Sequence, residues 1–370
     1  MPDVVLFETK PLTDGMQFGL VTLNAPKTLN SLSLEMIDLM LPQLIKWKDD
    51  PKIILVLFLS EGDRAFSAGG DIQNLYHDMV QHPGGPCPYS EAFFEREYRL
   101  DYLIQTYSKP TVVWGQGIAM GGGLGLLTAC SHKIATETTR IAMPEITIGL
   151  FPDAGATYAL SRMPEHYAHF LAWTGANING EDAKRVGMID YLINNDQQDA
   201  VVNAISSHSW AGNIADTLDQ LLNTFALDSR GFPPSQLAMH DQVISETVNA
   251  ALASDNPVRE FLEQCESLSD DRWLDKAVAT FKSGTPTTAA IIHEQIQRGK
   301  SMTREQILSM ELTLAVQCSR HEDFREGIRA LLIEKDNSPN WQYEMGGVPK
   351  ERVATHFSEP WPINPLSDLN

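Results

Sequence analysis

The segment TVVWGQGIAMGGG, residues 111–123, passes from a short apolar run through glycine into a helix start. A second segment of the same kind, AFSAGGD at residues 65–71, follows the continuous apolar run at residues 53–59. An unbroken apolar run is typical of a strand that is buried on both faces, as in a parallel sheet covered by helices. Two such strand–turn–helix units predict an α/β fold.

Strand and helix patterns alternate over the first half of the chain, and the character changes near residue 200. Beyond that point strand signals fade and helical periodicity dominates to about residue 335. The clearest internal break is DSRGFPP at residues 228–234. We therefore expect an α/β catalytic core at residues 1–200 and a mainly helical C-terminal region at residues 201–370.

The composition and the absence of certain motifs exclude several classes of function. The 370 residues carry a net charge of −20, which disfavours binding of nucleic acid, because such binding needs a basic field. The four cysteines form no CxxC pair, and HExxH, GxSxG and strict GxGxxG motifs are absent. The N-terminus lacks the features of a signal or transit peptide. We expect a cytoplasmic protein with no membrane span, no metal site and no cofactor.

The two glycine-bearing turns could supply hydrogen-bond donors to a ligand. We call residues 65–71 the first glycine turn and residues 117–123 the second. Each lies where a helix begins, and a helix N-terminus presents backbone N–H groups that have no partner inside the helix. Glycine lets a ligand approach that backbone closely. Two such turns that face one point would form an oxyanion hole. The alternative is that the glycines only permit tight turns and close helix packing.

A third segment, MPEITIGLFPDAG at residues 143–155, places two carboxylates in an otherwise apolar loop. Glu145 and Asp153 would lose solvation there, and burial of this kind raises the pKa of an acid and is common in catalytic groups. The alternative for Asp153 is a structural one, since its position before Ala154 and Gly155 also suits a helix N-cap.

Taken together, the order and spacing of these three segments resemble the crotonase (enoyl-CoA hydratase/isomerase) superfamily. The resemblance implies a spiral ββα core that binds an acyl-CoA, with the thioester carbonyl held between two backbone N–H groups. Matching the motifs places these donors on Gly70 and Gly122. Members of the superfamily often form trimers or pairs of trimers, so a homo-oligomer is one expectation for this chain.

One departure from the family pattern indicates a branch. The hydratases carry a glutamate two residues after the triple glycine, where this chain has Gly125. The second family glutamate corresponds to Glu145, and Asp153 occupies the Phe-Pro-Asp-x-Gly position of the 3-hydroxyisobutyryl-CoA hydrolase branch. The segments at residues 301–317 and 323–341 are similar to the tail of that branch. The resemblance thus implies hydrolysis of a short 3-hydroxyacyl-CoA, associated with valine breakdown; the alternative is an enoyl-CoA hydratase or isomerase.

The residues that would contact coenzyme A are expected near the first glycine turn. Lys27 matches a loop that borders the adenine in the family, and Arg64 is the cation nearest to the turn. Either could meet a phosphate as a point charge, or both could be solvated surface residues. Ala68 has a backbone role in the family and is expected to contact the adenine.

Overall fold

A computed structural model describes residues 3–226, 231–268 and 271–369, so residues 228–230 of the sequence break expected at 228–234 lie outside the described residues. The chain divides into two compact units that interleave along the sequence. The first unit consists of Met1–Gly70, Arg99–Ile141 and Ile178–Ser235, and the second of Asp71–Tyr98, Ala142–Asn177 and Gln236–Asn370.

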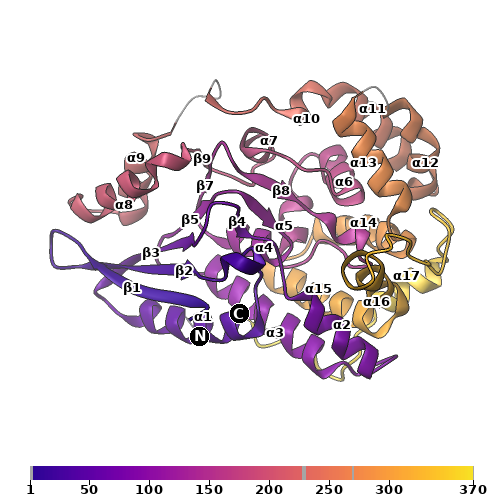
Figure 1. The fold of residues 1–370 in the computed structure, drawn as a ribbon, viewed down its shortest axis with the longest axis horizontal. Helices are drawn as coiled ribbons and strands as arrows, with labels where there is room; N and C mark the ends of the chain where they lie inside the picture. Colours follow the sequence, from indigo (N-terminus) through magenta and orange to yellow (C-terminus); the bar gives the residue numbers. More distant parts are fainter. Residues whose placement is uncertain (1–2, 227–230, 269–270, 370) are drawn as a thin grey trace. The chain divides into compact units, whose positions relative to one another are not determined.

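The first unit is built on a six-stranded sheet with the strand order β1-β2-β3-β5-β7-β9 (Figure 1). Strands β1 and β2 form an antiparallel hairpin, and each later pair in this sheet is parallel. A smaller sheet has the order β4-β6-β8. The strands are β1 (Val5–Pro11), β2 (Gln17–Leu23), β3 (Ile53–Ser60), β4 (Ala65–Ser67), β5 (Thr111–Gly115), β6 (Ile118–Met120), β7 (His132–Ala135), β8 (Arg140–Ala142) and β9 (Tyr191–Leu192).

Strand β3 is buried on both faces, as its apolar run predicts. Leu55 and Leu57 belong to a core cluster that includes side chains from the helices α8 (Gln198–Ser207) and α9 (Ile214–Asn223). Val56 and Phe58, which alternate with them, are also fully buried. The parallel sheet and the helices together give the predicted α/β class.

The other helices of the first unit are short, apart from α1, and Ser33 caps α1 through its side chain. They are α1 (Leu34–Asp49), α4 (Gly122–Ala129) and α7 (Gly180–Arg185), with 3₁₀ turns η1 (Pro26–Thr28) and η3 (Asn195–Gln197). Helix α3 (Pro88–Gln105) begins in the second unit and ends in the first.

The second unit is mainly helical. Its helices are α2 (Ile72–Gln81), α5 (Ala156–Leu160), α6 (Glu165–Thr174), α10 (Gln236–Met239), α11 (Asp241–Leu252), α12 (Pro257–Gln264), α13 (Arg272–Ser283), α14 (Pro286–Gly299), α15 (Arg304–Arg320), α16 (Glu322–Ile328) and α17 (Lys350–His356). Shorter turns are η2 (Pro144–Thr147), η5 (Cys265–Leu268) and the π-type turn η6 (Arg329–Ile333). Trp173, Phe261 and Phe281 pack together in its core, with ring centroids 4.8–6.2 Å apart.

The compact units differ from the division that we expected at residue 200. Helices α8 and α9 lie beyond that point in the sequence, but their apolar side chains, such as Val201 and Leu218, pack in the core of the sheet. Residues 71–98 and 142–177 precede it and belong to the helical unit. A helix belongs to the unit against which its apolar face packs. The position of the helix in the sequence does not show which unit that is.

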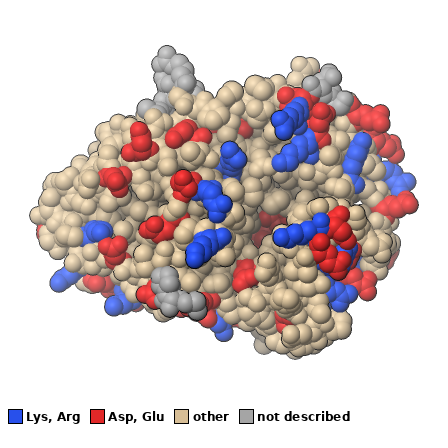
Figure 2. Space-filling model, viewed as in Figure 1, with Lys and Arg blue, Asp and Glu red and all other residues tan. Residues whose placement is uncertain are grey.

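The charged side chains do not form a single field on the visible face. Figure 2 shows acidic and basic side chains interspersed there, although the chain as a whole is strongly acidic. Among the described residues, no helix is both long enough and apolar enough to cross a bilayer.

Candidate active site

The two glycine turns touch each other within the first unit. Strands β4 and β6, which lie within these two segments, pair in parallel. A Cβ atom added to Gly69 would lie 3.3 Å from the carbonyl oxygen of Met120, and one added to Gly123 would lie 2.4 Å from that of Ser67. The second distance is too short for any side chain, so glycine at 123 permits this contact. The structure therefore brings together the two turns that the sequence singled out.

Each turn leaves a backbone donor unused. Gly122 is the first residue of α4, where an N–H has no acceptor inside the helix. The first turn is fixed by a hydrogen bond from the N–H of Leu32 to the carbonyl of Gly69, at 2.7 Å. Among the hydrogen bonds of the described residues, none uses the N–H of Gly70 or of Gly122 as donor. Two free amides on adjoining turns are the donors that the predicted oxyanion hole requires, and their role stays a prediction.

Lys27 and Arg64 line one cavity of about 250 Å³ in the first unit. The carboxylates of Glu61 and Asp63 line it as well, so its electrostatic character is mixed. Ala68 is outside this lining, and its N–H donates to the carbonyl of Leu29 at 3.0 Å. The structure thus brings the two predicted cations together, whereas the backbone N–H of Ala68 is already in use.

Glu145 lies in the second unit, on the 3₁₀ turn η2. The N–H groups of Ile148 and Leu150 donate to its carbonyl at 3.0 and 3.2 Å, which closes the loop beneath it. Its side chain is buried, and within the described part of the chain its Oε2 atom has no hydrogen-bond partner. Burial, and then the nearby charge of Asp153, raise the pKa of Glu145 well above its usual range.

Asp153 is buried in the same unit and has a hydrogen-bond donor. The hydroxyl of Tyr98 donates to its Oδ2 at 2.7 Å. Burial raises the pKa of Asp153 to about 6, although the hydrogen bond from Tyr98 opposes this rise. Two neighbouring buried acids therefore hold protons at a higher pH than exposed carboxyls do.

The alternative role of Asp153 as a helix N-cap does not hold. Helix α5 begins after Gly155, and its first amides are bound by a distant residue. The carboxylate of Glu311 accepts from the N–H of Gly155 at 2.7 Å, and from the N–H and hydroxyl of Thr157 at 3.0 and 2.5 Å. Burial raises the pKa of Glu311 to about 8 in spite of these three donors, which lower it. Asp153 thus keeps its carboxyl free of capping.

A second side chain from the C-terminal helices holds the same loop. The Nε2 atom of Gln295, on α14, donates to the carbonyl of Pro152 and to the hydroxyl of Thr157, both at 2.6 Å. With Glu311 on α15, it fixes the residues on both sides of Asp153. The sequence predicted neither of these contacts nor the one from Tyr98, because the partners are 55 to 156 positions apart and no local pattern joins them.

The predicted site residues thus fall into two groups. The turns that carry Gly70 and Gly122 touch each other in the first unit, and Glu145 and Asp153 interact electrostatically in the second. The first group offers backbone donors for a developing negative charge, and the second offers acids with raised pKa values. Such groups are the usual components of acyl-transfer and hydration chemistry. Among the described residues, no three His, Cys, Asp or Glu side chains gather as metal ligands would.

Comparison with known proteins identifies the relatives of this chain. The model of the enoyl-CoA hydratase/isomerase family matches residues 18–357. Similar curated proteins include the mitochondrial 3-hydroxyisobutyryl-CoA hydrolases of Xenopus tropicalis, 36% identical over 88% of this chain and 82% of that protein, and of Homo sapiens, 34% identical over 95% and 88%. Because these relatives are named as mitochondrial, the expectation of a cytoplasmic location is wrong.

Solved structures agree with the assignment of the fold. A structure described as an enoyl-CoA hydratase from Rhodobacter sphaeroides has a TM-score of 0.82 and 30% identity, covering 97% of this chain and 98% of its own. A structure described as a carnitinyl-CoA dehydratase from Mycobacterium thermoresistibile has a TM-score of 0.84 at the same identity and coverage. The similarity extends through the helical C-terminal region, so the crotonase-like fold with a helical C-terminal region is confirmed.

Proposed function

Because this chain belongs to the enoyl-CoA hydratase/isomerase family, we propose that it hydrolyses 3-hydroxyisobutyryl-CoA to the free acid and coenzyme A. The observation that carries the proposal is the match to hydrolases of that name over 88–95% of the chain. The buried pair Glu145 and Asp153 supplies acid–base groups for this chemistry. We extend the proposal to the role of such hydrolysis in valine breakdown.

The proposed reaction adds water across the thioester bond. Oxygen from water forms a bond to the acyl carbon, the carbon–sulfur bond breaks, and the sulfur leaves with a proton as the thiol of coenzyme A. Negative charge develops on the carbonyl oxygen, and the N–H groups of Gly70 and Gly122 would stabilise it. One donor of this kind is typically worth about 3–4 kcal/mol of barrier. Water and protein groups suffice for this balance, so the proposal includes no cofactor.

Two routes fit the burial of Glu145. In the first, its carboxylate attacks the acyl carbon and forms an anhydride, which water then hydrolyses. In the second, it takes a proton from the attacking water. Asp153 orients the water or the 3-hydroxyl group of the substrate. Acid-quenched enzyme examined by mass spectrometry distinguishes the routes, since only the first leaves an acyl group on Glu145.

Both routes need Glu145 in its ionised form, but its burial favours the protonated one. Hydrolysis is therefore expected to rise with pH as the buried pair loses its protons. The two acids interact, so the pH profile reports the pair and assigns no single value to either residue.

The test is release of free thiol from a panel of acyl-CoA thioesters. We expect 3-hydroxyisobutyryl-CoA to exceed isobutyryl-CoA, which lacks the hydroxyl, because a site that hydrogen-bonds a hydroxyl discriminates strongly against its absence. Replacing Glu145 by Gln should reduce the rate at least 100-fold, whereas the exposed Asp255→Asn should leave it unchanged. Wild-type rates for Glu145→Gln would refute the assignment of this residue.

A second candidate function follows from the solved relatives. The structure from Rhodobacter sphaeroides is described as an enoyl-CoA hydratase and is 30% identical to this chain. Incubation with crotonyl-CoA separates the two functions, because a hydratase forms 3-hydroxybutyryl-CoA without releasing thiol. Hydration faster than thiol release from the 3-hydroxyacyl substrate would favour the hydratase.

A further inference from the structure

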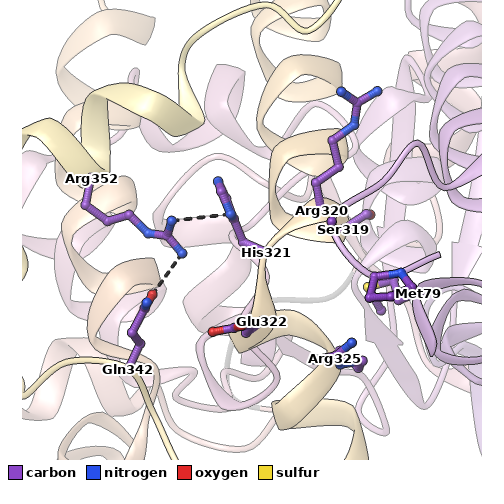
Figure 3. Close-up of a pocket in the computed structure, with 10 residues that line it drawn as sticks. Met79, Ser319, Arg320, His321, Glu322, Arg325, Gln342 and Arg352 are labelled. Atoms are coloured by element: carbon purple, nitrogen blue, oxygen red, sulfur yellow. Dashed lines mark hydrogen bonds between the residues drawn. The ribbon is translucent and has the colours of Figure 1, made fainter. Parts of the chain in front are cut away.

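We propose that a cavity in the second unit, apart from the residues assigned to hydrolysis, binds a small oxyanion through Arg325, His321 and Arg352. The cavity has a volume of about 200 Å³. Its lining includes side chains from α15, α16 and α17 and from the segment after α2. Figure 3 shows its labelled side chains. None of its lining residues has a part in the proposed hydrolysis, so the two proposals can fail separately.

The cavity contains two arginines without a carboxylate partner. Arg320 also lines it, but this guanidinium donates to Glu91 at 2.7 Å and points away from Arg352 in Figure 3. Within the part of the chain that the structure describes, neither Arg325 nor Arg352 forms an ion pair with a carboxylate. One carboxylate, Glu322, shares the lining. The local charge is therefore positive, although the chain as a whole is acidic.

Two buried donors at this cavity lack an acceptor. One nitrogen of Arg352 donates to Nδ1 of His321 at 3.3 Å, and a second donates to Gln342 at 2.9 Å. An arginine can only donate, so Nδ1 of His321 accepts and its Nε2 carries the ring proton. That Nε2 atom and the Nε of Arg352 are both buried without a partner among the described residues. Both residues line the cavity, so a small rotation of these side chains would bring the two donors to a bound oxyanion.

The size and the donors define the ligand class. A guanidinium presents paired donors that match the oxygens of a carboxylate or a phosphate. The volume corresponds to about seven waters at roughly 30 Å³ each, which accommodates a phosphate ion or a short organic acid. The ligand is thus a small molecule with a phosphate or carboxylate group, held by local donors against the net charge of the protein.

The experiment is calorimetric titration of the full chain with inorganic phosphate and, separately, with malonate, at constant ionic strength with chloride as the balancing anion. Binding of phosphate alone, malonate alone or both supports the proposal and identifies the anion. Binding of neither overturns it, because the cavity would then hold only water.

Variants assign the binding to this cavity. Arg325→Gln should raise the Kd roughly ten-fold or more, as expected for the loss of a charge-assisted hydrogen bond. This side chain has no hydrogen-bond partner among the described residues, so its replacement should leave the fold intact. Arg352→Gln should have a similar effect, and the exposed Arg140→Gln serves as the matched control. Unchanged binding in both cavity variants would overturn the proposal.

Discussion

Replacing Asp153 by Asn should stabilise the protein at alkaline pH while it abolishes hydrolysis. Burial raises the pKa of Asp153 from 3.8 to about 6. The buried carboxylate therefore destabilises the folded protein by ~3 kcal/mol once it is ionised. Asparagine has nearly the same shape, carries no charge, and can still accept the hydrogen bond from Tyr98.

The sign of the pH dependence follows from the raised pKa. Well below pH 3.8 the carboxyl is protonated in the folded and unfolded states alike, so its burial does not destabilise the folded protein. As the pH rises from 3.8 to about 6, the unfolded chain loses its proton first, and wild-type stability falls. The advantage of Asp153→Asn should therefore be about 1 kcal/mol at pH 4.5 and ~3 kcal/mol at pH 8.

The assay is urea unfolding at both pH values, followed by circular dichroism. Asp255→Asn is the control, because its carboxyl is exposed and should give no difference that depends on pH. Equal stability of wild type and Asp153→Asn at pH 8 would show that this carboxyl is not desolvated as the structure indicates. The proposed acid–base role of Asp153 would then lose its physical basis.

Three further changes test the supports of the site. Tyr98→Phe removes the donor to Asp153, so the acid limb of the pH–rate profile should move to higher pH; an unmoved limb would contradict this. Gly123→Ala gains about 1 kcal/mol of helix propensity but places a methyl 2.4 Å from the carbonyl of Ser67. We therefore expect the free energy of unfolding to fall by about 1–2 kcal/mol and kcat to fall as well. A rise in the urea midpoint would refute this prediction. Glu311→Gln places an NH₂ group against backbone donors, so we expect the free energy of unfolding, measured by thermal unfolding, to fall by about 1–3 kcal/mol. An unchanged Tm would argue against this capping contact.

Local patterns in the sequence predicted the parts of the fold that local physics decides. The apolar run of β3 is a buried strand, Gly123 lies where two turns approach too closely for a side chain, and Gly69 has a positive φ that favours glycine. The same reasoning placed Glu145 and Asp153 in an apolar loop, where both are buried. In each case the signal lies within a few consecutive residues.

The contacts that hold the acids could not be predicted in this way. Glu311 binds the loop after Asp153 from 154 to 156 positions away, and its own helix gives no sign of a buried carboxylate. The packing of α8 and α9 with the sheet is likewise long-range, so the single boundary at residue 200 does not describe the interleaved units. Whether Gly70, Gly122 and the acids act on one thioester stays a prediction for the kinetic test.

The contacts from Gln295 and Glu311 also set an order of events during synthesis. While a ribosome is still translating the segment before residue 295, the loop that carries Asp153 has neither of the anchors that fix it. The glycine turns need only residues up to about 123 and can form much earlier. A nascent chain would therefore form the turns with its backbone donors long before its acids are in place. It would become able to hydrolyse its substrate only when the last quarter of the polypeptide has emerged.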